Sequence, residues 1–125
     1  KQYQMTNDQN SKHFDLEERT FQYAKRCRVF TQKLPKTQEN FNDSDQLIRA
    51  SGSVGANYIE ANEALSKKDF FLRIKICRKE AKESKYWLRL VNIKNLPELE
   101  KEREELINEA TELTKIFGSI IEKSK

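Results

Sequence analysis

The sequence has few glycines, prolines and cysteines and no long apolar run, which argues against several large classes of protein. Three glycines and two prolines leave too few turn residues for a sheet with many hairpins. No apolar run approaches the ~18 residues of a membrane-spanning helix, and the first residues do not read as a signal peptide. Two cysteines, Cys27 and Cys77, are too few for a disulfide framework. We expect reduced core thiols in a cytoplasmic protein, a disulfide between their two helices being the alternative.

Histidine is almost absent, and this excludes the commonest chemistry of helical bundles. The one histidine, His13, lies in a polar N-terminal stretch. A di-iron bundle uses Glu-x-x-His on two helices, and no predicted helix contains a histidine to complete that pattern or to activate a thiol. A carboxylate pair such as Glu60 and Glu80 would serve as acid and base only if burial separated their pKa values. We therefore predict a protein that is not an enzyme, with no catalytic, cofactor or metal site.

Charge and periodic apolar residues are what the sequence has in quantity. Hydrophobic residues make up 36% and charged residues 35%, a balance typical of long helices with solvated faces. Apolar side chains recur at alternating spacings of four and three residues, the period of one buried helix face, in Leu16–Leu34, Leu47–Leu65, Phe70–Val91 and Leu99–Ile120. The sequence predicts an all-α, up-down-up-down antiparallel four-helix bundle over residues 14–125, after a flexible lead-in of residues 1–13.

Capping residues place the helix boundaries. We expect helices to start near Asp15, at Asp43 or Ser44, at Ser66 with Asp69 completing a capping box, and at Pro97. The first helix should stop at Pro35, and the last should run to about Glu122. The connection Lys36–Asn42 should tuck Phe41 back onto the bundle.

Two glycines lie within the second predicted helix. Gly52 and Gly55 each cost about 1 kcal/mol relative to alanine in a helix, which is tolerable where another backbone must approach. A phosphate-binding loop is the alternative, but no Gly-Lys-Ser/Thr follows and no strand precedes. We interpret both glycines as close packing contacts.

The third predicted helix carries two apolar stripes on opposite sides. One stripe, from Phe70 to Val91, suits the core. The other side holds apolar residues that a single small bundle does not cover, so we predict that a second copy of the chain covers them. The predicted oligomer interface comprises Leu72, Ile76, Tyr86, Trp87 and Leu90.

Polar residues interrupt the apolar faces of the second and third helices. Buried polar groups are unfavourable unless paired, and their best-attested use is to fix register and partner number. We predict a polar seam between these two helices or between subunits, a solvated flank being the alternative. Its members are Arg49, Asn57, Glu60, Asn62, Lys79, Glu80 and Glu83, with Lys79 and Glu83 at the spacing of an ion pair.

Positive charge is concentrated in the third helix. From Ser66 to Asn95 there are ten Lys/Arg and three Asp/Glu, a net +7, whereas Pro97–Lys125 has five and eight, a net −3. Neighbouring helices could partly neutralise each other, and solubility alone is one explanation of a charged face. The alternative is a phosphate-binding flank, formed by Lys75, Arg78, Lys82, Lys85 and Arg89.

The second and third helices also carry a resemblance to a known family. The run from Arg49 to Ala61, followed by Ser66, Asp69-Phe70, Lys79-Glu80-Ala81 and Glu83-Ser84, resembles the bacterial four-helix bundle proteins of the 23S ribosomal RNA intervening-sequence family. The resemblance extends from about Phe14 to Ile121. The family commonly has Ala-Glu-Gly where this chain reads Ile59-Glu60-Ala61, which indicates a variant branch.

The resemblance implies a ring-like homopentamer around a central channel. It also implies kinship with the accessory variability determinant of diversity-generating retroelements, a basic barrel that binds a reverse transcriptase and nucleic acid. The family has no established activity and no catalytic residue to carry over. Its members were first noticed as reading frames inside intervening sequences of ribosomal RNA genes, which suggests contact with RNA or DNA.

Two functions follow as hypotheses. The first is a homo-oligomer that binds RNA or DNA without sequence preference through the basic face of the third helix. The second is an oligomeric scaffold that binds a protein partner and has no direct role with nucleic acid. Binding to nucleic acid at low and moderate salt would distinguish them.

Overall fold

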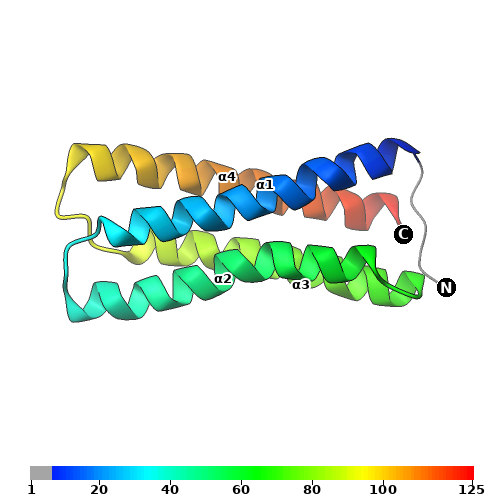
Figure 1. Ribbon diagram of the computed structural model, residues 1–125, viewed down its shortest axis with the longest axis horizontal. Coiled ribbons are helices and arrows are strands. Elements are labelled where there is room, and N and C mark those ends of the chain that lie inside the picture. Colours follow the sequence, from blue (N-terminus) through cyan, green and yellow to red (C-terminus); the bar gives the residue numbers. More distant parts are fainter. Residues whose placement is uncertain (1–6) are drawn as a thin grey trace.

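Four α-helices make up the described part of the chain. The computed structural model describes the backbone of residues 7–125 and the side chains of residues 16–125. The helices are α1 (Asn7–Gln32), α2 (Gln38–Asn62), α3 (Lys67–Leu90) and α4 (Pro97–Lys123). Successive helices run in opposite directions along one long axis (Figure 1), and each packs against two neighbours in the order α1, α2, α3, α4, with α4 against α1. The predicted all-α bundle of four antiparallel helices is confirmed.

The first helix is longer than expected. It begins at Asn7, eight residues before the start predicted near Asp15, so part of the predicted lead-in is helical. Extending a helix that is already anchored requires only one residue to be fixed per added hydrogen bond, so polar residues can continue it without an apolar stripe. Residues 1–6, the rest of that lead-in, lie outside the described residues, as does the side chain of His13.

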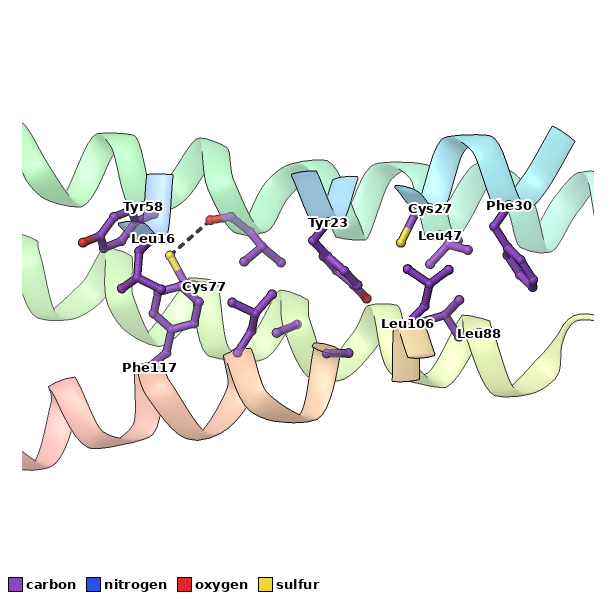
Figure 2. Packing of buried hydrophobic residues seen from close by; sticks show 14 of the residues in the cluster. Leu16, Tyr23, Cys27, Phe30, Leu47, Tyr58, Cys77, Leu88, Leu106 and Phe117 are labelled. Atoms are coloured by element: carbon purple, nitrogen blue, oxygen red, sulfur yellow. Dashed lines mark hydrogen bonds between the residues drawn. The ribbon is translucent and has the colours of Figure 1, made fainter. Parts of the chain in front are cut away.

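The core consists of the predicted stripes. Every predicted inward residue of α1 from Leu16 to Leu34 is buried, and so is the whole stripe of α3 and its cap from Phe70 to Val91. Figure 2 shows aromatic rings, aliphatic side chains and both cysteines packed between the helices. A large side chain buried in this way contributes roughly 1.5–3 kcal/mol. Leu65, expected to end the α2 stripe, is instead 69% exposed because α2 ends before it, at Asn62.

One hydroxyl pair crosses the middle of the core. The Tyr23 Oη and Ser84 Oγ atoms lie 2.6 Å apart, joining α1 to α3. Ser84 Oγ also lies 2.7 Å from the Ala81 carbonyl oxygen, to which it donates, so Tyr23 donates to Ser84. Burial raises the pKa of Tyr23 far above its ordinary value, which keeps the phenol neutral. The pair satisfies two polar groups that would otherwise be buried without partners.

The second helix begins earlier than predicted. Its N-cap is Thr37, whose Oγ1 accepts a hydrogen bond of 3.1 Å from the Asn40 amide. The expected start at Asp43 or Ser44 is therefore wrong, and so is the inward placement of Phe41, which is 51% exposed. The third helix begins as predicted, with the Asp69 amide donating to Ser66 Oγ over 3.0 Å.

Asn40 ties two loops together at one end of the bundle. Its Nδ2 donates to the carbonyl oxygens of Pro35 (3.0 Å) and Asn92 (2.8 Å). Its Oδ1 accepts from the Asn92 amide over 2.9 Å. The side chain is almost fully buried, and it joins the α1–α2 connection to the α3–α4 connection, 52 residues away.

Of the two glycines in α2, only Gly55 makes the close contact expected of both. A Cβ atom at Gly55 would lie 2.9 Å from Thr20 Oγ1 and 3.3 Å from Thr20 Cβ. Thr20 is buried, and its hydroxyl donates to the Leu16 carbonyl over 2.7 Å, so the side chain has no free rotation. At Gly52 a Cβ would meet only the Arg28 guanidinium, at 3.6 Å. The close-packing interpretation is wrong for Gly52.

Alanine at these two positions should therefore have opposite effects on stability. We expect Gly55→Ala to lower the free energy of unfolding by about 1–2 kcal/mol, because overpacking outweighs the gain in helix propensity. Gly52→Ala should raise it by about 0.5–1 kcal/mol, because the gain is unopposed. Urea denaturation followed by circular dichroism measures both. Equal shifts in the same direction would contradict the assigned Thr20 contact.

Candidate nucleic-acid interface

The predicted phosphate-binding residues form one exposed flank of α3. Lys75, Arg78, Lys82 and Arg89 are exposed and Lys85 is half-buried; these five residues are called the basic flank below. The 14 residue steps from Lys75 to Arg89 rise about 21 Å, the axial length of roughly six base pairs. Within residues 16–125, none of the five side chains forms an ion pair.

Three uncharged residues of α4 lie on the helix face next to Arg78. The Arg78 side chain passes Gly118, where a Cβ would lie 4.0 Å from Arg78 Cδ. Thr114 and Thr111, four and seven residues earlier, continue the same face of α4. Their hydroxyls donate to carbonyl oxygens of their own helix, over 2.7 and 2.8 Å. Gly118, Thr114 and Thr111 therefore place no charged side chain beside Arg78.

The carboxylates of α4 that form ion pairs with another helix pair with α1. Glu109 accepts two hydrogen bonds from the Arg19 guanidinium, a bidentate pair at 2.7 and 2.9 Å. Glu102 lies 3.1 Å from Lys33 Nζ. The expectation that the acidic fourth helix neutralises the basic third helix is wrong for these two carboxylates, because they lie on the side of α4 that faces α1. The positive charge of the basic flank stays uncompensated by them.

One residue of the predicted polar seam forms a hydrogen bond between α2 and α3, and its partner was not among the predicted residues. Asn57 Oδ1 accepts from Arg73 Nη1 over 3.1 Å, which joins the two helices. Asn62 faces α1 instead and donates to Glu17 over 3.2 Å. Arg73 was not predicted, although it lies on the same face of α3 as Glu80, seven residues on, and that spacing could have identified it.

The charged members of the seam gather around Glu80. Its side chain is 18% exposed, and Lys79 Nζ lies 3.9 Å from its carboxylate, so Lys79 forms its ion pair with Glu80 rather than with Glu83. Desolvation, then the charge of Glu83, raise the pKa of Glu80, while Lys79 and Arg49 act in the opposite direction. Glu60 is exposed. The seam thus combines one hydrogen bond between α2 and α3, from Arg73 to Asn57, with exposed charged residues such as Glu60.

The outward side of α3 exposes apolar area, as predicted. Leu72 is 55%, Tyr86 54% and Leu90 49% exposed; these three residues are called the outer apolar face below. Ile76 is half-buried. Trp87 departs from the prediction, because its indole packs against the core of its own chain, with Tyr86 edge-on at 4.9 Å between ring centroids.

The two cysteines are buried and unpaired, which confirms the interpretation as core thiols. Cys77 Sγ donates to the Val54 carbonyl over 3.4 Å (Figure 2). Burial raises the pKa of both thiols to about 12, so the reactive thiolate is scarce at neutral pH.

We expect neither thiol to react with a disulfide reagent such as dithionitrobenzoate at pH 8 in the folded protein. Both should react within seconds in 6 M guanidinium chloride, because unfolding restores an ordinary thiol pKa of about 8.5. Counting the thiolate released under each condition checks this. Stoichiometric release from the folded protein would contradict the burial of Cys27 and Cys77.

No cluster of three or more metal-ligating His, Cys, Asp or Glu side chains occurs among the described residues. Across the same part of the chain, no helix combines the length and apolar character needed to cross a membrane.

Comparison with known proteins identifies the family. A family model described as 23S rRNA-intervening sequence protein matches residues 12–119. The chain belongs to that family. The chain is also similar to a crystal structure of a protein with unknown function from the S23 ribosomal protein family of Bacteroides thetaiotaomicron. The two share 34% identity over 84% of this chain and 96% of that one, with a TM-score of 0.73. No curated protein matches the sequence.

The motif by which this 23S rRNA-intervening sequence protein resembles its family lies on α2 and α3. Gly55 and Ser66 serve packing and capping, and Asn57 joins the two helices. The motif is therefore explained in large part by how α2 packs against its neighbours. The basic flank and the outer apolar face lie on other sides of α3.

Proposed function

We propose that this intervening-sequence protein binds RNA or DNA, without sequence preference, through the basic flank of α3. The observation that carries the proposal is the pairing of Glu109 and Glu102 with α1, which leaves the flank without compensation from those carboxylates. A row of cations without ion pairs attracts phosphates at any sequence, because phosphate contacts carry no base information. The role is non-enzymatic in this proposal, as predicted from the sequence.

The size of the flank sets the expected salt dependence. If about four of its five cations contact phosphates of a duplex, the logarithm of affinity should fall with a slope of about −3.6 against the logarithm of salt concentration. Affinity should then drop about 100-fold between 50 and 200 mM salt. Such steep loss distinguishes phosphate binding from apolar adsorption.

A filter-binding assay tests the proposal. Two RNAs and two DNAs of unrelated sequence are titrated with purified protein at 50 and 200 mM salt. We expect all four to bind at the lower salt with affinities within a few fold, and all to weaken steeply at the higher salt. Absence of binding at both salts would overturn the proposal.

We propose further that copies of the chain associate through the outer apolar face. Leu72, Tyr86 and Leu90, each about half exposed, support this, as does the resemblance, which implies a ring-like homopentamer. A ring would repeat the basic flank five times. Light scattering should give a multiple of 14.8 kDa, and Leu72→Glu/Leu90→Glu should reduce it to one chain without unfolding, because both side chains are half in solvent.

A protein-interaction scaffold is the second candidate, and the same outer apolar face favours it. A partner protein would then bury Leu72 and Leu90, and the basic flank would serve solubility. Failure of nucleic acid to bind at either salt, together with a stable oligomer, would support the scaffold. In both proposals we place the protein in the cytoplasm, which its unpaired buried thiols support.

A further inference from the structure

A pocket that opens widely to solvent, called the cavity below, lies at the end of the bundle where α3 begins and α4 ends. Its volume is about 740 Å³, within the range of small-molecule sites. Phe71, Leu72 and Ile121 supply its apolar lining. The polar and charged lining consists of Ser66, Lys67, Lys68, Asp69, Lys75, Ser124 and Lys125.

The charge of this cavity is strongly positive. Four lysines and one aspartate line it. Lys125 is engaged by Glu122 at 3.0 Å, and Lys67 Nζ lies 5.7 Å from the centroid of the Phe71 ring. Lys67, Lys68 and Lys75 form no ion pair within residues 16–125. Such a lining suits a ligand with a flat ring and an anionic group. The ring would pack on the apolar side chains, and the anion would lie near the lysines that form no ion pair.

The cavity is continuous with the basic flank. Lys75 belongs to both, as the first cation of the flank and as a lining residue of the cavity. A strand whose phosphates follow the flank from Arg89 towards Lys75 would thus arrive at the cavity. There its base would meet Phe71 and Ile121, and its last phosphate would meet Lys67 and Lys68.

We infer that the cavity holds the phosphorylated terminal nucleotide of a nucleic-acid strand bound along the basic flank. This inference rests on the proposed function, because it needs a strand on the flank. It goes further by assigning the protein a preference for strand ends that carry a phosphate.

Competition between oligonucleotides tests the inference. Twelve-nucleotide strands of one sequence, carrying a 5′-phosphate, a 3′-phosphate or neither, compete with a labelled strand for the protein at low salt. We expect one of the phosphorylated strands to compete about three- to tenfold better than the unphosphorylated strand. Equal competition by all three would overturn the inference while leaving the proposed function intact, whereas absence of binding by all three would overturn both.

Matched variants separate the cavity from general charge. Lys67→Gln/Lys68→Gln should abolish the preference for the phosphorylated end and change the binding of the unphosphorylated strand little. Lys101→Gln/Lys115→Gln removes the same charge from exposed positions of α4 and should keep the preference. Circular dichroism confirms the fold of each variant. Retention of the preference in Lys67→Gln/Lys68→Gln would assign it elsewhere.

Discussion

Asn40→Ala should lower the free energy of unfolding by about 2–4 kcal/mol, more than any other single substitution considered. The change removes three hydrogen bonds of 2.8–3.0 Å. The carbonyl oxygens of Pro35 and Asn92 and the Asn92 amide would then lack these hydrogen-bond partners near a buried site. An unsatisfied polar group at such a site costs about 1–3 kcal/mol. Urea denaturation followed by circular dichroism gives the free energy of unfolding for variant and parent.

Asn42→Ala is the matched control. Asn42 lies two residues further along α2, is exposed, and accepts one solvent-facing hydrogen bond from Gln38. Its loss should change stability by less than about 0.5 kcal/mol. Asn40→Asp should destabilise at least as much as alanine, because it sets a carboxylate against two carbonyl oxygens. Similar small effects at positions 40 and 42 would refute the assigned link between the two loops.

Lys82→Glu/Lys85→Glu should weaken binding to nucleic acid by at least about tenfold at low salt. The change removes two cations from the middle of the basic flank and places two anions where phosphates should lie. The salt slope should also become shallower by about two, since each lost phosphate contact removes about one. Fluorescence anisotropy with a labelled duplex, repeated at several salt concentrations, measures both quantities.

Lys101→Glu/Lys115→Glu controls for overall charge. Either double variant brings the formal net charge from +4 to zero, and Lys101 and Lys115 are exposed on α4 outside the flank. We expect this control to lose far less affinity and to keep the parent's salt slope. Should both double variants weaken binding equally, net charge alone would account for the attraction and the basic flank would have no special role.

The sequence predicted the fold well because helix periodicity is local. The spacing of apolar residues marks which face of each helix is buried, and the stripes of α1 and α3 are buried without exception. The N-cap at Ser66 could also be predicted from the sequence, because its hydrogen bond joins two residues only three positions apart.

What the sequence could not specify depends on distant contacts. The sequence predicted that α2 starts at Asp43 or Ser44, but the structure places the start at Thr37. There Asn40 reaches Asn92, 52 positions away. Which side of α4 faces α3 depends on the arrangement of the helices around the bundle, which periodicity leaves open. For that reason, the sequence suggested that the acidic fourth helix could partly neutralise the basic third helix, whereas Glu109 and Glu102 of α4 pair with α1.

In the candidate site, too, features within one helix could be predicted from the sequence and contacts between helices could not. The basic flank could be predicted because all five residues share one helix face. The hydrogen-bond partners of the polar seam could not be predicted. Asn57 and Asn62 lie only five residues apart, yet Asn57 contacts α3 and Asn62 contacts α1. The cavity was missed because its lining combines the start of α3 with the end of α4, two segments separated by most of two helices.

Photo-crosslinking most directly tests whether nucleic acid lies along α3. An RNA that contains 4-thiouridine is bound at low salt, irradiated and digested, and the crosslinked peptides are identified by mass spectrometry. We predict crosslinks within residues 75–89, on or next to the basic flank. Crosslinks confined to α1 or α2, with none in α3, would contradict the account.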